Sequence, residues 1–447
     1  MPDLEKIAAA VVDRAAPGEQ VEAYVGWARD TSVRVYDGDV ESLSSAESEG
    51  VGIRVVIGDR QGFAYAGSLD QSVVTDTLAE ARDNAGFATP DAAVGLATPD
   101  GVPVADLDLW RDELVSLAAE EKVAMALELE KRARSADARI RQVESANYGD
   151  AMSETAIASS TGIRAAGRRT GCHLSVWLIA GQGDDTQTGG GYSVGRKADD
   201  LSIDEAAADA VERATRMLGS RKARSARLPV IFDRRVASTF LGILAGTFSG
   251  EAVLKGRSLF ADRLGEDVAH PSITLVDDPT RSEAFGAAAY DAEGLACRRN
   301  VLVDGGVLTR FLYDSYSARR AGTKSTGSAV RAGFKSAPGV GCRALALAPG
   351  TRSLEEIMAS IGEGLLVQTV SGVHSGVNPV SGDFSVGAEG LMFRGGNTAE
   401  PVREITIAST LQRMLHDVIE IGGDEEWLPG LAAGVTLAVD GLALSGS

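Results

Sequence analysis

Cysteine and histidine are scarce in this chain of 447 residues. It contains three cysteines (Cys172, Cys297 and Cys342) and four histidines (His173, His270, His374 and His416). The cysteines are odd in number and far apart in sequence, which excludes a disulfide framework and a CxxC zinc site. The closest two histidines, His374 and His416, are too far apart for an HExxH or HExxxH helix. An ordinary zinc-peptidase site built within this chain is therefore excluded.

Aromatic residues and long apolar runs are also rare. Aromatics make up 5% of the chain, whereas hydrophobic residues as a whole reach 44%, so we expect globular cores built from Val, Leu, Ile and Ala. No apolar run approaches the length of a membrane span. The first residues lack the basic and apolar regions of a signal peptide, so we expect a cytoplasmic protein with no membrane partner.

Basic residues are in deficit, with 44 Lys and Arg against 63 Asp and Glu and a net charge of −19. A surface this negative repels nucleic acid, so we expect no nucleic-acid partner. The basic run over 213–227 is interpreted as a solvated helix end and linker.

Glycine is abundant, with 52 residues, and its distribution favours turns and strands. The patterning predicts an α+β protein. An N-terminal α/β domain over 1–87, with mixed or antiparallel sheets, precedes a linker over 88–111. A middle α+β region over 112–222 opens with one long helix over 112–136, and it either stands alone or packs with the first domain. A large β-rich domain occupies 226–447, with helices over 235–246, from Ser353 and over 409–417.

Two short motifs resemble nucleophile sites. GYSVG at 191–195 matches G-x-S-x-G, but a glycine run precedes Ser193 and no helix follows at once, so we interpret 181–195 as a hairpin or loop. Cys172 and His173 are neighbours on a predicted strand. Their side chains point to opposite faces, which argues against a thiolate–imidazolium pair.

The segment SGVHSGVNPVSGDFSVGAEG, at 371–390, gathers polar side chains among glycines. Small residues let another backbone approach closely, which suggests the wall of a peptide groove. A set of tight turns explains the same pattern. The groove candidates are His374, Asn378, Ser381, Gly382, Asp383, Phe384 and Ser385.

Three segments of the C-terminal half carry a resemblance to a known family. They are LPVIFDRRVASTFLGILAGTFSGEAV (228–253), YDAEGLACRRNVLVDGGVLTRFLYDSYSARRAGTKSTG (290–327) and the stretch from NPVSGDFSVGAEGLMFRGG to EITIASTLQRMLHDVIEIGGD (378–424). Near the N-terminus, GVGIRVVIGDRQGFAYAGSLD (50–70) fits as well. This order of motifs resembles the TldD/PmbA family, known as modulators of DNA gyrase and regarded as peptidases.

The resemblance implies a division of labour between two subunit types. The TldD type carries HExxxH on a helix of the C-terminal domain, with a distant cysteine, and the PmbA or TldE type lacks these ligands. Here the corresponding helix offers Arg234, Arg235, Val236, Ser238 and Thr239, and no cysteine follows the GGD at 422–424. The resemblance thus implies a non-catalytic subunit without a cofactor. It also implies a TldD-like partner that holds zinc, or a homodimer, acting on unfolded or small peptides.

Two alternatives stay open on the sequence. One is a self-contained, metal-independent hydrolase or tailoring enzyme of the same fold, acting as a homodimer in a natural-product pathway, with Ser193, Cys342 or the region of Asp383 as its reactive site. The other is a binding or scaffold protein without enzymatic activity.

Overall fold

The N-terminal half is built on one antiparallel sheet. The structure is a computed structural model that describes residues 3–446. The sheet has six strands in the order β3-β2-β1-β4-β5-β6. Their bounds are β1 (Glu19–Tyr36), β2 (Asp39–Ile57), β3 (Arg60–Ala66), β4 (Ile140–Ser159), β5 (Arg164–Gln182) and β6 (Asp185–Gly195). Because β1 pairs with β4, the region over 1–87 and the middle region share one sheet.

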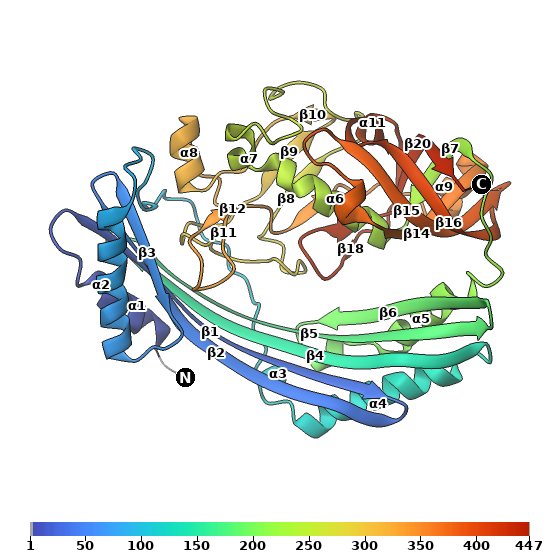
Figure 1. The fold of residues 1–447 in the computed structure, drawn as a ribbon, viewed down its shortest axis with the longest axis horizontal. Coiled ribbons are helices and arrows are strands. Elements are labelled where there is room, and N and C mark those ends of the chain that lie inside the picture. The colour runs from blue at the N-terminus through green and yellow to red at the C-terminus, as the bar shows by residue number, and fades with distance from the viewer. Residues whose placement is uncertain (1–2, 447) are drawn as a thin grey trace.

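Helices cover one face of this curved sheet, and the C-terminal domain lies over the other (Figure 1). The helices are α1 (Leu4–Val12), α2 (Gln71–Phe87), α3 (Asp112–Val115), α4 (Ala119–Ser135) and α5 (Ile203–Thr215). Alternation along β1 explains the two faces. Val21, Ala23 and Val25 pack in a core with α1 and α2, whereas Tyr24 and the glycine at 26 face the opposite way.

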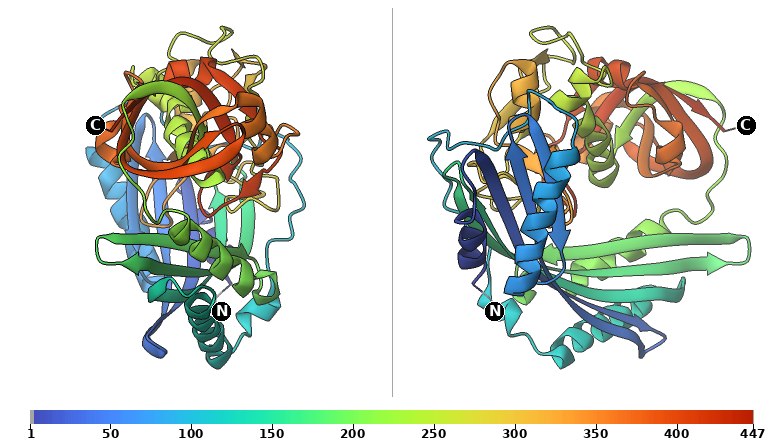
Figure 2. Two further views of the ribbon diagram at one scale, coloured as in Figure 1. Left: turned by 90° about the vertical axis from the view of Figure 1, so that its right-hand side faces the viewer. Right: turned by 60° about the vertical axis from the view of Figure 1, so that its left-hand side comes forward.

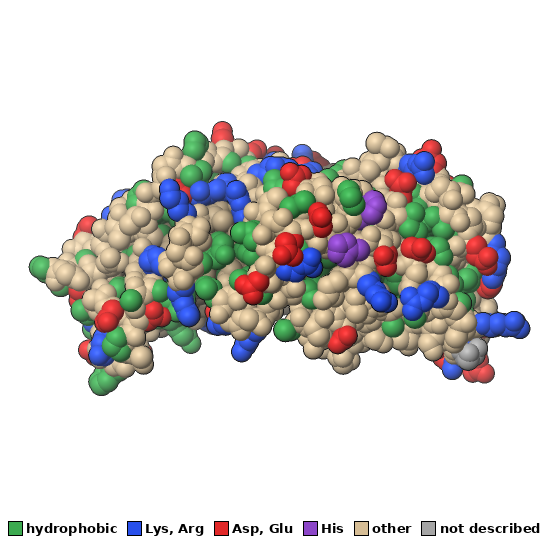
Figure 3. All heavy atoms as spheres, turned by 90° about the horizontal axis from the view of Figure 1, so that it is seen from above, with side chains coloured by type: hydrophobic (Ala, Val, Ile, Leu, Met, Phe, Trp, Pro, Cys, Tyr) green, Lys and Arg blue, Asp and Glu red, His purple; other side chains and the backbone are tan. Residues whose placement is uncertain are grey.

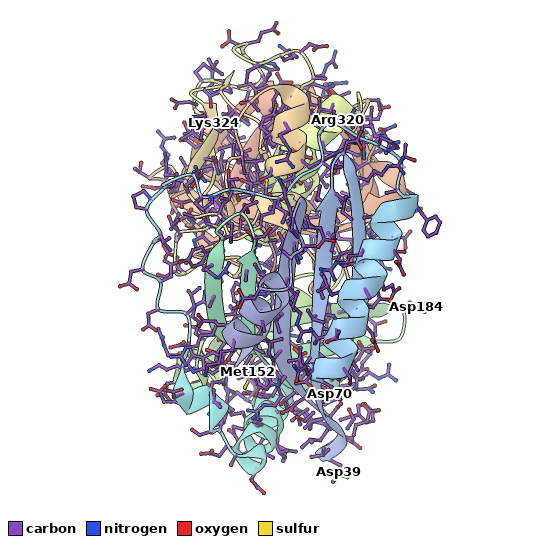
Figure 4. All side chains as sticks on the ribbon, turned by 90° about the vertical axis from the view of Figure 1, so that its left-hand side faces the viewer. Asp39, Asp70, Met152, Asp184, Arg320 and Lys324 are labelled. Atoms are coloured by element: carbon purple, nitrogen blue, oxygen red, sulfur yellow. The ribbon has the colours of Figure 1, made fainter. Side chains whose placement is uncertain are left out.

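The turn chemistry agrees with the sequence. A two-residue turn joins β1 to β2, with Asp37 at φ 52° and Gly38 at φ 83°, which is the pairing that favours a tight hairpin. The glycine-rich stretch over 181–195 forms the turn and the second strand of a hairpin, because β6 pairs with β5 along the whole length of β6. Figure 4 labels Asp39, beside the turn between β1 and β2, and Asp184, in the turn between β5 and β6, and the strand register places both turns at the same end of the sheet.

One predicted helix is wrong in its extent. The single helix expected over 112–136 is two helices, α3 and α4, separated at Ser116. The Ser116 hydroxyl donates to the carbonyl of Asp112 at 3.1 Å, at the end of α3. The backbone then becomes extended at Ala118, at ψ 149°, and the Glu121 carboxylate accepts the Ala118 amide at 3.1 Å, which begins a new helix.

The C-terminal domain combines a barrel-like sheet with a smaller sheet. The larger sheet runs β16-β15-β14-β7-β20-β17, and β16 also pairs with β20, which closes the ring. Its strands are β7 (Ala226–Phe232), β14 (Glu363–Ser371), β15 (Asp383–Arg394), β16 (Asn397–Thr410), β17 (Val418–Ile421) and β20 (Leu437–Ser445). The smaller sheet and two ribbons contain β8 (Leu275–Asp277), β9 (Asn300–Asp304), β10 (Val307–Leu308), β11 (Ala329–Val330), β12 (Gly339–Val340), β13 (Leu345–Leu347), β18 (Glu426–Trp427) and β19 (Ala433–Gly434).

Six helices accompany these strands: α6 (Arg234–Ala245), α7 (Gly250–Leu254), α8 (Ser315–Ala321), α9 (Leu354–Ile361), α10 (Val373–Gly376) and α11 (Leu411–His416). The C-terminal domain lies above the N-terminal sheet in both further views (Figure 2). As predicted, Ser353 caps α9 in a capping box with Glu356. The outer face of the C-terminal domain mixes basic and acidic side chains (Figure 3). In residues 3–446, no helix is long and apolar enough to cross a membrane.

Candidate functional site

Helix α6 takes the place that the family resemblance gives to a metal-binding helix. Asp233 caps it by accepting the Val236 amide at 2.9 Å. Its inner face is apolar, since Val236, Phe240 and Leu244 are all buried in the core of the C-terminal domain. Ser238 donates to the carbonyl of Ala432 at 2.8 Å, which fixes α6 beside the loop that follows β18.

The first two residues of α6 are engaged in ion pairs. Arg235 pairs with Asp209 of α5 and donates to the carbonyl of Gly190 in β6 at 2.7 Å. Arg234 pairs with Glu426 at 2.8 Å. Thr239 donates back to the carbonyl of Arg235 at 3.0 Å, within the helix. All these polar groups of α6 therefore serve packing or the junction between the two halves.

These residues do not fit a zinc ion. Zinc takes Cys, His or carboxylate ligands, and α6 presents none of them. The nearby carboxylates are already neutralised, because Arg234 pairs with Glu426 and Arg281 forms a two-point pair with Glu425 at 3.0 and 2.9 Å. Within residues 3–446, no three His, Cys, Asp or Glu side chains are grouped so that they could hold a metal.

The predicted groove segment forms α10, a turn and the start of β15. Asn378 organises the turn, since its Oδ1 accepts the amides of Val380 and Ser381 at 2.9 and 3.2 Å. Ser381 donates to the Asp383 carboxylate at 2.7 Å. The carbonyl of Gly382 accepts the Leu411 amide at 2.7 Å, which ties the turn to α11. Local turn bonds thus account for these polar side chains, and their role in a groove stays a prediction.

Side chains of this segment divide between core and solvent. His374, Asp383 and Ser385 are exposed, whereas Phe384 is buried. The Phe384 ring packs edge-on against Phe240 of α6, with ring centroids 6.5 Å apart. The predicted groove segment therefore contacts α6 through an aromatic pair in the core, by way of Phe240, which is outside the predicted set of α6 residues.

A concave site lies elsewhere, between the sheet and the C-terminal domain. A cavity of about 1100 Å³ is bounded by the face of the sheet opposite the helices, by the linker over 106–110 and by loops over 287–292 and 331–335. None of the seven predicted groove residues lines it. Sites between domains are common locations for ligands.

Cationic side chains dominate this cavity. Its lining includes Arg168, Arg169, Arg331, Lys335 and Arg343, against three aspartates, Asp106, Asp108 and Asp291. Burial and the neighbouring Glu293 raise the pKa of Asp291 to about 7, so this carboxyl carries only part of a charge near neutral pH. In a protein of net charge −19, this local excess of positive charge is unusual.

Sequence reasoning missed this cavity because its residues are spread from position 24 to position 343. No motif joins them. The one local signal was the arginine pair at 168–169, on a strand whose cavity-facing positions are otherwise small.

The alternative nucleophiles are held in structural roles. Ser193 lies in β6 and not on a strand-to-helix turn, and its Oγ accepts the Ser202 amide at 2.9 Å. Burial raises the pKa of Cys172 to about 12, because the thiol packs in the core under α4 and α5. Burial also raises the pKa of Cys342 well above its ordinary value. These environments do not favour a thiolate or an activated hydroxyl.

Comparisons with known proteins agree along the chain. Three consecutive domains match: PmbA/TldA metallopeptidase domain 1 over 21–85, the central domain over 112–218 and the C-terminal domain over 225–446. Metalloprotease PmbA of Escherichia coli O157:H7 is 30% identical over 427 residues, covering 94% of this chain and 92% of that protein.

The TldD type matches as well. The metalloprotease TldD homolog of Haemophilus influenzae is 26% identical over 404 residues, covering 87% of this chain and 82% of that protein. The crystal structure of TldE from Thermococcus kodakarensis superposes with a TM-score of 0.89 at 23% identity and covers 99% of both chains, which confirms the fold. On these matches, the chain belongs to the PmbA/TldD family of metallopeptidases.

Proposed function

We propose that this chain is the subunit without metal ligands in a two-subunit zinc peptidase of the cytoplasm, and that its partner is a TldD-like relative carrying HExxxH. The partner would bind zinc and activate water, and this chain would complete the chamber that receives unfolded or small peptides. Family membership supports the peptidase assignment, and the chemistry of α6 supports the subunit type.

The observation that carries the proposal is the engagement of α6. Arg234 and Arg235 are paired with Glu426 and Asp209, and Ser238 is bonded to Ala432. A metal site here would need new ligands and would also need these contacts to be broken. Because the polar groups of α6 make structural contacts, they support a subunit that contributes structure to the peptidase and no metal ligands.

The test compares three preparations: this chain alone, an HExxxH-bearing relative encoded beside it, and the two together. Each is assayed on a mixture of short unstructured peptides, with and without a chelator, and its zinc content is measured. We expect zinc in the partner, and chelator-sensitive cleavage that is strongest in the mixture.

A matched control replaces the glutamate of the partner's HExxxH motif with glutamine, which should abolish cleavage while the two chains still co-purify. Chelator-sensitive cleavage by this chain alone would refute the proposal. Activity that survives chelation would favour a self-contained enzyme, and a mixture that forms without any cleavage would favour a scaffold.

A further inference from the structure

The cavity between the two halves has a floor of small side chains set in register across three strands. Gly26 of β1 pairs with Thr155 of β4, which pairs with Gly167 of β5. The next row of the same face contains Ala28, Ser153 and Arg169. A Cβ added at Gly167 would meet only Thr155 Oγ1, at 3.9 Å, so the space above it is open. A flat floor of this kind lets an extended backbone lie close to the sheet.

Cationic groups converge at the edge of this floor. Arg331 lies over the Tyr24 ring, with its guanidinium carbon 4.6 Å from the ring centroid. Burial raises the pKa of the Tyr24 hydroxyl, while the charges of Arg331, Arg343 and Arg169 oppose that rise. Three guanidinium groups on separate elements therefore act on one hydroxyl.

Arg331 is held in an ion pair within the protein, whereas Arg169 and Arg343 are not, although the charge of Arg343 opposes the rise that burial causes in the pKa of Asp277. Arg331 donates to Glu22 at 2.7 Å in a buried cluster with Arg54 and Glu293. Arg169 and Arg343 form no ion pair with any carboxylate in residues 3–446. The side chain of Arg343 donates only to the carbonyl of Ala329, at 3.2 Å, while its backbone amide donates to Asp277.

Two arginines of the cavity lining also have buried donor atoms without acceptors. The side chain of Arg331 is 1% exposed, yet its Nε and Nη1 have no hydrogen-bond partner, and the same is true of the buried Nε of Arg343. Buried donors without acceptors are costly, and a carboxylate is the planar acceptor that matches a guanidinium. The nearby Asp291 does not fill this role, because its oxygens accept the amides of Glu293, Leu295 and Ala329.

We propose that this cavity binds the carboxylate of a short peptide, with Arg169 and Arg343 as the groups that pair with it and the row Gly26–Thr155–Gly167 beneath the peptide backbone. The choice of a peptide as the carrier of the carboxylate rests on the proposed function. The carboxylate is either the peptide's C-terminus or an acidic side chain, and the experiment separates the two.

The experiment is calorimetric titration of the whole chain at low ionic strength with three probes. They are acetyl-trialanine with a free C-terminus, its C-terminal amide, and acetyl-Ala-Asp-Ala amide. We expect the free acid to bind at least tenfold more tightly than the trialanine amide, and to lose affinity as NaCl is raised. Equal binding of the aspartyl amide and the free acid would support the site with a side chain as its ligand.

Variants locate the site. Arg343→Gln and Arg169→Gln should each weaken binding of the free acid about tenfold, as expected for loss of a charge-assisted contact. Arg141→Gln is the matched control, because Arg141 is an exposed arginine of β4 outside the cavity. Gly167→Leu should block binding sterically while all the charges remain. Thermal unfolding of each variant confirms that it is folded.

Equal affinity for the acid and the trialanine amide would overturn the inference, as would unchanged binding by the glutamine variants or no binding of any probe. Because the titration needs neither zinc nor a partner, its outcome is independent of the cleavage assay. Binding without partner-dependent cleavage would leave the carboxylate site standing and refute the proposed function.

Discussion

The guanidinium of Arg235 lies over the ring of Tyr192, with its central carbon 4.0 Å from the ring centroid. This contact joins the first turn of α6, in the C-terminal domain, to β6, the edge strand of the N-terminal sheet. Helix α6, which occupies the place of the metal-binding helix in the family resemblance, thus connects the two halves of the chain.

Replacing Arg235 with methionine should lower the free energy of unfolding by about 2 kcal/mol. The variant loses the stacking on Tyr192, the bond to the carbonyl of Gly190 and the pair with Asp209. Arg234→Met is the matched control. Its arginine is half exposed and pairs with Glu426, so its loss should cost less than about 1 kcal/mol. Urea unfolding measures the free energy of unfolding of both variants. Equal losses in the two variants would contradict the role of Arg235 in joining the two halves.

Phe384 should prove structural. Its ring is buried against Phe240, so Phe384→Ala should lower the free energy of unfolding by about 3 kcal/mol through lost burial and a cavity. The neighbouring Ser385 is exposed, and Ser385→Ala should change the free energy of unfolding by less than about 0.5 kcal/mol. A Phe384 variant of unchanged stability, measured by thermal or urea unfolding, would show that this ring is available to a ligand.

The cysteines should be unreactive in the folded protein. Burial raises the pKa of both Cys172 and Cys297 to about 12 and raises that of Cys342 well above its ordinary value. The thiolate is the reactive form, so at pH 8 Cys172 and Cys297 should react with a disulfide reagent roughly a thousandfold more slowly than a free cysteine, and Cys342 should also react slowly. In guanidinium chloride, all three should react at once. Fast labelling of one native thiol would revive the hypothesis of a reactive cysteine.

Stability should depend on pH through Asp291. Its pKa is raised from 3.8 to about 7 in the folded protein, so the folded state binds a proton that the unfolded state releases between these values. The contribution of this group is fully present below about pH 4 and is lost as the pH rises through 7. Over that window, Asp291→Asn should remove up to one proton from the slope of the unfolding free energy against pH.

Asp304→Asn is the control for this measurement, because Asp304 is an exposed aspartate of the same domain. It should leave the slope as in the parent protein. The comparison of slopes is needed because the amide of the Asp291 variant faces the Ala329 amide and loses one hydrogen bond whatever the pH. Identical slopes in all three proteins would mean that Asp291 is ionised in the folded state.

Local chemistry made much of the fold predictable. The Asp37-Gly38 turn, the capping box at Ser353 and the alternation along the strands depend on neighbouring residues, so the sequence alone indicates them. The break at Ser116 did not follow from periodicity, because the apolar spacing of 112–136 continues across it. The break results from the extended backbone conformation at Ala118.

The candidate site was predictable only where it depended on residue type. The lack of metal ligands on α6 is a matter of composition at one segment, and it could be stated in advance. The charged cavity depends on strand register, which places Arg169 beside Ser153, and on a loop that brings Arg343 to the same space. Neither the register nor the loop can be derived from spacing along the chain.

The pairing of β1 with β4 also constrains the order in which this protein can fold during synthesis. Positions 22–35 of β1 find their partners at 146–159, beyond the irregular linker. Until β4 has left the ribosome, the edge of β1 that pairs with β4 stays open, and such edges invite pairing with other chains. The family's first domain matches residues 21–85 as a separate sequence domain. The open edge of its strand β1 is nevertheless covered only after β4, in the middle domain, has been synthesised. We therefore expect a chain truncated after residue 111 to aggregate through the open edge of β1.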